Sequence, residues 1–257
     1  LIIAVDPDAD RCALAVPDPA SETGWSPLSG DQIGSLLGEF LAERGMTGSL
    51  ANSIVSSRLL SRIARAHGLE HHTTLTGFKW IARAPGLGFG YEEAIGFCPD
   101  PAHVRDKDGI ATSVVAASLV AALKAQGRSV WDELERLARL HGLHVSSPLT
   151  FRVEEIEQIA NGMARLRAQP PSVLAGSPVV EVSDLSQGYR GLPPTDGVLV
   201  LTEAGDRVIA RPSGTEPKLK CYLEVILPVT EGEPLPWDQA RERLDAIKGA
   251  FAEIIGL

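Results

Sequence analysis

The sequence has few cysteines, few aromatic residues and no long hydrophobic run. Three of the 257 residues are cysteines, far apart in the chain: Cys12, Cys98 and Cys221. They form neither a Cys-x-x-Cys pair nor a Cys/His pattern with zinc spacing, which is typical of a reduced, cytoplasmic protein. No segment approaches the roughly 18 consecutive apolar residues of a membrane-spanning helix, so we expect no membrane partner.

Positive charge is also in the minority. The chain carries 24 lysines and arginines against 33 acidic residues, a net charge of −9. This balance argues against broad nucleic-acid binding, and an anionic ligand would need a local cluster of positive charge. Hydrophobic residues make up 44% of the chain, an ordinary globular share that excludes disordered, collagenous and coiled-coil classes. The length predicts one large domain or two ordinary ones.

The chain opens inside an apolar run, and its first residue is Leu1 instead of methionine. Residues 1–5 and 12–16 predict two strands joined by an acidic loop, and a turn-rich stretch follows over 18–30. A domain rarely begins inside a strand, so we expect a preceding segment. Residues 1–28 are then the end of a preceding domain, and this end carries the acidic loop.

Residues 29–148 predict an α/β domain. Apolar residues at helical spacing indicate four helices, the first capped by Asp31 and the third opened by Asp108. Short strands are expected at 53–55 and 73–75. Such alternation is typical of a parallel or mixed sheet covered by helices. The expected helices cover 31–44, 59–67, 108–126 and 130–141.

Residues 149–257 change in character. A helix is predicted over 154–167 and another over 237–255, with consecutive strands between them. Consecutive strands followed by a helix indicate a smaller α+β domain. The predicted strands are Val198–Leu201, Arg207–Ala210 and Leu219–Leu227.

The acidic loop has the pattern of a metal site. Asp6, Asp8 and Asp10 lie two residues apart in a tight turn, so their carboxylates can converge on one hard cation such as Mg²⁺. Arg11 follows and can donate two hydrogen bonds to an anionic oxygen. A calcium loop is excluded, because Arg11 and Pro17 stand where glycine and glutamate are required. An exposed acidic turn without a metal is the weaker alternative.

The segment Thr76–Ile81 places one lysine between two aromatic residues. Gly77 allows a ligand to approach the backbone, and Lys79 can pair with a phosphate or transfer a proton. The segment alone fits equally well an ordinary core turn in which Lys79 faces water.

Two adjacent carboxylates lie in the glycine-bounded segment Gly90–Phe97. Glu92 and Glu93 can accept hydrogen bonds from sugar hydroxyls. The preceding glycines resemble part of a dinucleotide fingerprint, but Tyr91 stands where a glycine is needed, which excludes nucleotide binding. Taken alone, the segment is an ordinary glycine-rich loop.

The segment Arg211–Lys218 is a turn bracketed by two prolines, with two hydroxyl groups and free backbone N–H groups around Gly214. Arg211 stands at its entrance and Lys218 at its exit. Residues 206–220 contain four basic and two acidic residues, so this stretch is locally positive. The arrangement predicts a phosphate cradle.

In this order, the four segments resemble the α-D-phosphohexomutase superfamily, over essentially the whole chain. The acidic loop is similar to the family's magnesium loop, and Arg211–Lys218 is similar to its C-terminal phosphate loop. Thr76–Ile81, Tyr91–Phe97 and Arg105–Gly109 are most similar to the branch with phosphopentomutases and glucose-1,6-bisphosphate synthases. The resemblance implies four domains in the family, of which this chain has the end of the second, the third and the fourth.

The resemblance also implies roles for single residues. Asp6, Asp8 and Asp10 would bind Mg²⁺, and Arg11 and Lys79 would act at the reacting phosphoryl group and the sugar phosphate. A sugar 1,6-bisphosphate would be the activator and intermediate. The implied substrate-binding residues are Gly77, Glu92, Glu93, Lys107, Arg211, Ser213, Gly214, Thr215 and Lys218.

The sequence departs from the family at two points. Ala94 stands where many hexose enzymes have serine, and the phosphorylated serine in its Ser-His-Asn-Pro context is absent from these residues. We therefore expect part of a phosphosugar mutase that moves phosphate between C1 and C6, or C1 and C5. Its missing N-terminal domains would supply the phosphoserine. The alternatives are a non-catalytic phosphosugar-binding fragment and a metal-dependent phosphatase with Asp6 as its nucleophile.

Overall fold

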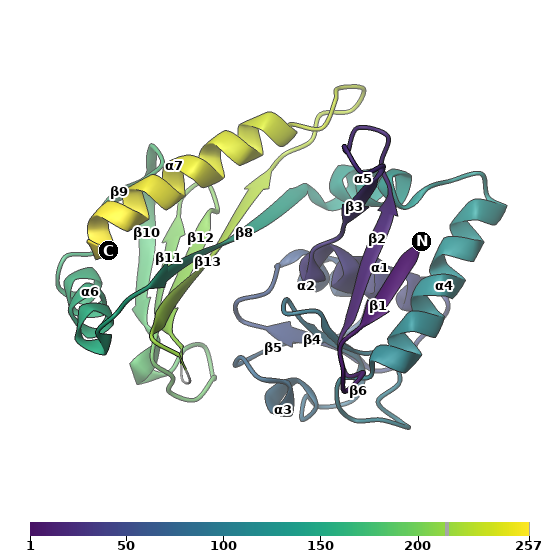
Figure 1. Ribbon diagram of the computed structural model, residues 1–257, viewed down its shortest axis with the longest axis horizontal. Coiled ribbons are helices and arrows are strands. Elements are labelled where there is room, and N and C mark those ends of the chain that lie inside the picture. Colours follow the sequence, from purple (N-terminus) through teal and green to yellow (C-terminus); the bar gives the residue numbers. More distant parts are fainter. Residues whose placement is uncertain (214–215, 257) are drawn as a thin grey trace. The chain divides into compact units, whose positions relative to one another are not determined.

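The computed structural model describes residues 1–213 and 216–256. Its internal contacts divide the chain into two compact units, Leu1–His141 and Gly142–Leu257, called unit 1 and unit 2 below (Figure 1). Unit 1 mixes helices with two small sheets, whereas unit 2 is built on one antiparallel sheet. The predicted fold class, α/β followed by α+β, is confirmed.

Unit 1 begins with a three-stranded antiparallel sheet in the order β1-β2-β3. Its strands are β1 (Ile2–Val5), β2 (Cys12–Pro17) and β3 (Trp25–Pro27). Alternate β2 side chains, Cys12, Leu14 and Val16, are buried in the core of unit 1, where the helix α4 (Gly109–Ala125) packs beside β1 and β2 (Figure 1). The two predicted strands are confirmed, while β3 lies in the stretch expected to be turns.

The second sheet of unit 1 is mixed, in the order β5-β4-β6-β7. Strand β4 runs parallel to β5 and β6, and β7 is antiparallel to β6. The strands are β4 (Ser49–Ser53), β5 (His71–Thr74), β6 (Leu87–Glu92) and β7 (Gly96–Cys98). The strand expected at 53–55 was placed too late, since β4 ends at Ser53. The glycine-rich segment forms β6 and β7, which leave only a short turn between them.

Helices cover both faces of this mixed sheet. Leu50 of β4 faces a core formed with α1, α2 and α4, whereas Ala51 faces a smaller core with α3. The helices are α1 (Gly30–Glu43), α2 (Leu59–Ala66), α3 (Phe78–Ile81), α4 (Gly109–Ala125) and α5 (Val130–His141). Among the described residues, no single helix combines the length and hydropathy needed to cross a membrane; α4 and α5 do so only jointly, with an 89° bend between them.

The start of α1 differs from the prediction. Ser29 is the N-cap, and its hydroxyl accepts a hydrogen bond from the Gln32 backbone N–H while Gln32 caps Ser29 in return. Asp31 lies in the first turn, where it is buried and accepts hydrogen bonds from the Ser57 backbone N–H at 2.7 Å and the Tyr91 hydroxyl at 3.0 Å. By contrast, the predicted cap of α4 by Asp108 is confirmed.

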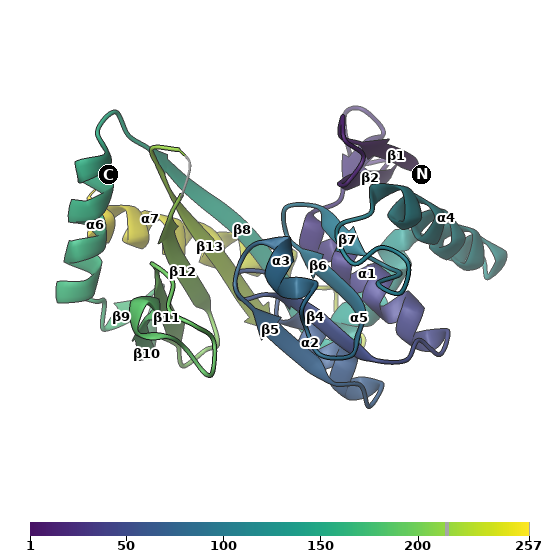
Figure 2. The ribbon, with the colours of Figure 1, turned by 90° about the horizontal axis from the view of Figure 1, so that it is seen from below.

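Unit 2 consists of a six-stranded antiparallel sheet with α6 (Ile156–Ala168) and α7 (Trp237–Ile255) on one of its faces (Figure 2). The strand order is β8-β13-β12-β11-β10-β9, and a short 3₁₀ helix covers Leu185–Gln187. The strands are β8 (Leu143–Arg152), β9 (Val173–Leu174), β10 (Ser177–Asp184), β11 (Val198–Thr202), β12 (Arg207–Pro212) and β13 (Lys218–Leu227).

Strand β13 divides its side chains between an apolar face and a face that carries charged groups. Every second residue, from Leu219 through Leu223 to Leu227, is buried. On the other face, Glu224 binds His144 of β8 at 3.1 Å and Arg207 of β12 at 3.3 Å. The contact with His144 and the ion pair with Arg207 join three neighbouring strands, while Lys218 and Lys220 lie at the start of β13.

Candidate functional site

The acidic loop between β1 and β2 gathers three carboxylates. One carboxylate oxygen from each of Asp6, Asp8 and Asp10 lies within 4.8 Å of the others. The loop turns through Ala9, which has a left-handed φ of 58° and donates its N–H to the Asp6 carbonyl at 2.9 Å. A tight turn therefore brings side chains from alternating positions to one point, as the sequence predicts.

A backbone hydrogen bond stabilises the anionic form of Asp6 in this loop. The Arg11 backbone N–H donates to Asp6 Oδ1 at 3.0 Å, and this bond lowers the pKa of Asp6 below its ordinary value. Arg11 Nε lies 4.0 Å from Asp10 Oδ1. Three acidic oxygens on one side of a turn suit a hard divalent cation such as Mg²⁺, which prefers oxygen ligands.

Glycines fix the acidic loop onto the rest of unit 1. The Gly109 N–H donates to the Ala9 carbonyl at 3.0 Å, and a Cβ at Gly109 would come within 2.6 Å of the carbonyl oxygens of Ala9 and Arg11. Arg11 also forms a β-bridge with Gly96 of β7. Only glycine at 109 leaves room for this contact, so the start of α4 and the acidic loop form one structural piece.

Lys107 connects the acidic loop to two other predicted segments. Its Nζ lies 2.9 Å from Asp10 Oδ2 and 3.7 Å from Asp106, and it stands 5.4 Å from the centre of the Phe78 ring. The side chain is only 16% exposed. Burial lowers the pKa of Lys107, but its hydrogen bond and charge interaction with Asp10 outweigh burial and raise it, so the ammonium group stays charged.

Glu92 lies at the end of β6, close to Lys107. Burial raises the pKa of Glu92, while the positive charges of Lys107 and Arg11 oppose this rise. A Cβ on Gly96 would lie 3.0 Å from Glu92 Oε1 and 2.5 Å from Lys107 Cδ. The structure thus brings the acidic loop together with Glu92 and Lys107, both of which lie more than 80 residues further along the sequence.

The neighbouring Glu93 points elsewhere. Its Oε2 accepts hydrogen bonds from the hydroxyls of Ser53 at 3.0 Å and Ser56 at 2.9 Å, and its backbone N–H donates to Ser56. Burial raises the pKa of Glu93. The carbonyl of Glu93 also packs against Gly30, where a Cβ would lie 2.1 Å away. Sequence reasoning missed these serines, although three serines lie in the run from Ser53, the last residue of β4, to Ser57.

Gly77 and Lys79 lie at the short helix α3. Gly77 is its N-cap with φ of 104°, and Lys79 is exposed, with Nζ 5.7 Å from the centre of its neighbour's Trp80 ring. Phe78 and Ile81 are buried, so the core alternative accounts for the apolar residues of this segment. Lys79 remains available to a ligand, and among the described residues it has no carboxylate partner.

The predicted phosphate loop lies in unit 2, between β12 and β13. Arg211 lies opposite Lys220 in the strand register, and the Ser213 N–H donates to the Lys218 carbonyl at 2.9 Å. Lys218 Nζ lies 2.6 Å from Glu216 Oε1, and this hydrogen bond lowers the pKa of Glu216. The remaining two predicted residues, Gly214 and Thr215, lie outside the described residues.

The two units match two successive domains of one enzyme family. Residues 29–140 match the family model described as phosphoglucomutase/phosphomannomutase, alpha/beta/alpha domain III, and residues 149–226 match the C-terminal domain of the same family. The chain belongs to the phosphoglucomutase/phosphomannomutase family of the α-D-phosphohexomutase superfamily. The predicted resemblance is confirmed.

Individual relatives of known sequence or structure are similar to this chain over most of its length. The chain is 44% identical to a protein of Haemophilus influenzae named "Probable phosphomannomutase", over 87% of this chain and 45% of that protein. It is 31% identical to a phosphopentomutase of Mus musculus, over 98% of this chain and 45% of that protein. The phosphoglucomutase parafusin of Paramecium has the same fold, with a TM-score of 0.70 at 19% identity, over 99% of this chain and 46% of that one. The chain therefore spans about half the length of its relatives.

Proposed function

We propose that this chain forms the metal loop, the sugar-binding domain and the C-terminal phosphate-binding domain of a phosphosugar mutase. The mutase moves phosphate between C1 and C6, or C1 and C5, of a sugar phosphate through a phosphoserine and a bisphosphate intermediate. The observation that carries the proposal is the junction of Asp10, Lys107 and Glu92, since it unites metal-binding, cationic and hydroxyl-accepting groups.

The acidic loop fits a magnesium ion, which Asp6, Asp8 and Asp10 would hold. Bound there, Mg²⁺ would neutralise charge that develops on a transferring phosphoryl group. Arg11 lies beside this loop and can donate to a phosphoryl oxygen with its planar guanidinium. The Lys107 ammonium supplies a second positive charge, already fixed by Asp10. The chain's own contribution to catalysis is then fixed positive charge and orientation.

The sugar is held from a separate loop. We assign Glu92 to the sugar hydroxyls, because its carboxylate faces Lys107 and is bound by no serine. Glu93 serves as a positioning residue that fixes the turn through Ser53 and Ser56. At α3, Gly77 allows a ligand to approach the backbone, and Lys79 presents an exposed ammonium group. Arg211, Ser213 and Lys218 of unit 2, with Gly214 and Thr215, would hold the phosphate that does not react.

The proposal requires a phosphoryl donor from elsewhere in the same protein. We assign it to a phosphoserine on N-terminal domains like those of the family, with residues 1–28 as the end of the second domain. A sugar 1,6-bisphosphate would serve as activator. The three cysteines are buried and unpaired, and burial raises the pKa of both Cys98 and Cys221 to about 12. Such inert thiols accord with a reducing, cytoplasmic compartment.

The test uses the protein that carries this chain, together with any N-terminal domains. Mutase turnover is measured with glucose 1-phosphate, mannose 1-phosphate and ribose 1-phosphate, in the presence of Mg²⁺ and glucose 1,6-bisphosphate. Asp8→Ala should reduce kcat by about 1000-fold or more, because one metal-binding carboxylate is lost. The matched control Asp238→Ala removes an exposed carboxylate on α7 and should leave turnover unchanged. Equal turnover in wild type and Asp8→Ala would refute the assignment.

Two further measurements address the alternatives. If the isolated chain binds glucose 1,6-bisphosphate and the carrying protein has no mutase activity, the chain is a phosphosugar-binding module. If the isolated chain releases phosphate and Asp6→Asn abolishes that release, it is a phosphatase. No contact in the structure favours either alternative over the mutase.

A further inference from the structure

A hollow lined by three arginines and two glutamates lies on unit 1, and it includes no residue of the acidic or sugar loops. The hollow, of about 540 Å³, opens between the C-terminal ends of α1, α2 and α5. This volume lies within the range of roughly 300–1,000 Å³ of small-molecule sites. Its lining comes from all three helices: Glu39, Glu43, Arg62, Arg65, Ala66, His67, Arg136, Leu140 and His141.

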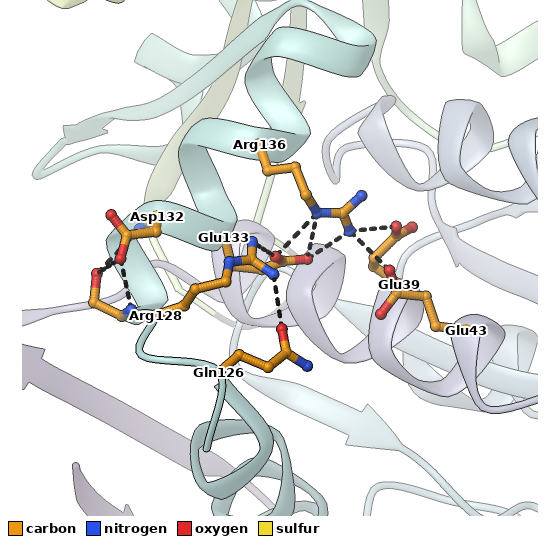
Figure 3. A network of polar contacts seen from close by, with 8 residues as sticks. Glu39, Glu43, Gln126, Arg128, Asp132, Glu133 and Arg136 are labelled. Atoms are coloured by element: carbon orange, nitrogen blue, oxygen red, sulfur yellow. Dashed lines mark hydrogen bonds and ion pairs between the residues drawn. The ribbon is translucent and has the colours of Figure 1, made fainter. Parts of the chain in front are cut away.

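The glutamates of this hollow already have polar partners. Arg136 Nη2 lies 2.6 Å from Glu39 and 3.1 Å from Glu43, and it also binds Glu133 at 2.6 Å (Figure 3). Glu39 receives a further contact from His67 Nε2 at 2.9 Å. The carboxylates therefore turn toward Arg136 and His67, and the other arginines of the hollow are left to interact with something else.

Those other arginines are Arg62 and Arg65 of α2. Arg62 donates one N–H to the His141 carbonyl at 3.0 Å, and neither guanidinium has a carboxylate partner among the described residues. Both are exposed and lie three residues apart, so they point from the same side of the helix. Residues 54–69 contain three arginines and no acidic residue, in a chain with a net charge of −9.

From these contacts we infer that the hollow binds a compact anion with two or more negative charges, a phosphate ester or a polycarboxylate. Arg62 and Arg65 grip the anion through paired N–H donors, a geometry that matches phosphate and carboxylate oxygens. Leu140 and Ala66 provide apolar wall for the carbon part of the ligand. This inference goes beyond the proposed mutase function and does not depend on it.

The hollow is separate from the site described above. It shares no residue with the acidic loop, the sugar loop or the phosphate loop. Helix α1 has 14 residues and so runs for about 20 Å, from Gly30 beside Glu93 to Glu43 in the hollow. A ligand bound there would touch the far end of the helix whose first turn supports the sugar loop.

The test is calorimetric titration of the 257-residue chain with inorganic pyrophosphate and, separately, with citrate, in the absence of magnesium. An Arg211→Ala background removes binding at the predicted phosphate loop. The double variant Arg62→Ala/Arg65→Ala should weaken saturable binding at least tenfold. Arg139→Ala is the control for the loss of an arginine, because it removes one positive charge from an α5 side chain that is paired with Glu135 and does not line the hollow. It should change the affinity less than twofold.

The two titrants, pyrophosphate and citrate, distinguish the two classes of anion that the hollow could bind. Tighter binding of pyrophosphate identifies a phosphate ester as the ligand class, and tighter binding of citrate identifies a polycarboxylate. The charge-conserving pair Arg62→Lys/Arg65→Lys should still weaken binding at least threefold, because the guanidinium fork is lost. Absence of saturable binding to the parent background, or equal affinity in all these variants, would overturn the inference.

Discussion

Two carboxylate clusters in unit 1 have similar composition and different surroundings. The acidic loop holds Asp6, Asp8 and Asp10, and the helical cluster holds Glu39, Glu43 and Glu133; in each, three carboxylate oxygens lie within 4.8 Å of one another. In the acidic loop the cations stand at one edge, on Asp10. In the helical cluster Arg136 contacts all three glutamates (Figure 3).

The position of the cation decides what each cluster can do. Asp6 and Asp8 have no side-chain cation within ion-pair distance among the described residues, so their oxygens can bind a metal. Glu39 and Glu133, by contrast, are 4% and 5% exposed and are held by Arg136. That arrangement joins α1 to α5. Three clustered carboxylates are therefore better placed to bind a metal where cations contact only one of them, as at Asp10, than where one arginine contacts all three.

The largest expected difference between the clusters is in metal affinity. Mg²⁺ should bind the acidic loop, and Asp8→Ala should lower that affinity roughly 100-fold, since loss of a direct ligand costs at least as much as loss of its supporting hydrogen bonds. Glu43→Gln, in the helical cluster, should leave the affinity unchanged. Calorimetric titration of the 257-residue chain with MgCl₂ measures both. Equal losses in the two variants would contradict the comparison.

The free energy of unfolding should depend on the helical cluster, whereas metal affinity should depend on the acidic loop. Arg136→Met leaves two buried glutamates without their shared partner and should reduce the free energy of unfolding by about 2 kcal/mol, below the range for a fully buried pair because Arg136 is 30% exposed. Arg139→Ala, in an exposed pair with Glu135, should cost less than about 0.5 kcal/mol. Urea unfolding compares the two. A smaller loss for Arg136→Met than for Arg139→Ala would show that the network is not structural.

The helical cluster should also make stability depend on pH. Burial alone raises the pKa of Glu133, but hydrogen bonds and charge from Arg136 and Arg128 outweigh it and hold that pKa below its ordinary value of 4.5. A lowered folded-state pKa stabilises the fold above the ordinary pKa, and this contribution is lost as the pH falls through the folded-state value. The stability gap between wild type and Glu133→Gln should therefore shrink from pH 6 to pH 3. A gap that widens on acidification would reverse the assignment.

The smallest effect is expected at the edge of the acidic loop. Arg11 Nε stands 4.0 Å from Asp10, and its side chain is 47% exposed, so Arg11→Ala should change the free energy of unfolding by less than about 0.5 kcal/mol. In the carrying protein, the same substitution should reduce mutase kcat, because Arg11 is assigned to a phosphoryl oxygen. Urea unfolding and turnover measured on the same variant separate the two roles. A loss of stability without a loss of turnover would show that Arg11 is structural.

Local sequence patterns correctly predicted the helices that depend on interactions between residues close in sequence, such as apolar spacing and N-caps. Helices α4 and α5 were expected from apolar spacing and from the Asp108 cap, and both lie within two residues of the expected bounds. Strand β4 was misplaced because Ser49–Ser53 has no β-branched residue and depends on burial between β5 and β6. Strand β8 was missed because it contains Pro148, which an edge strand tolerates.

In the candidate site, too, the sequence predicted contacts within one loop but not contacts between distant segments. The convergence of Asp6, Asp8 and Asp10 followed from their spacing, since one tight turn produces it. The contact of Asp10 with Lys107 depends on how the β1–β2 hairpin packs against the start of α4, which no local pattern encodes. Glu92 and Glu93 could not be told apart by type, because their neighbours, Lys107 and the two serines, come from other parts of the chain.

The glycine contact between the acidic loop and α4 has a consequence for recombining this protein with its relatives. Gly109 admits the carbonyls of Ala9 and Arg11 only because it has no side chain. A hybrid joined just after Pro17 would take the acidic loop from one parent and the start of α4 from the other. The close backbone contact between them would then be disrupted. A hybrid joined between His141 and Gly142, at the boundary between the two compact units in the sequence, would take the acidic loop and the start of α4 from the same parent protein.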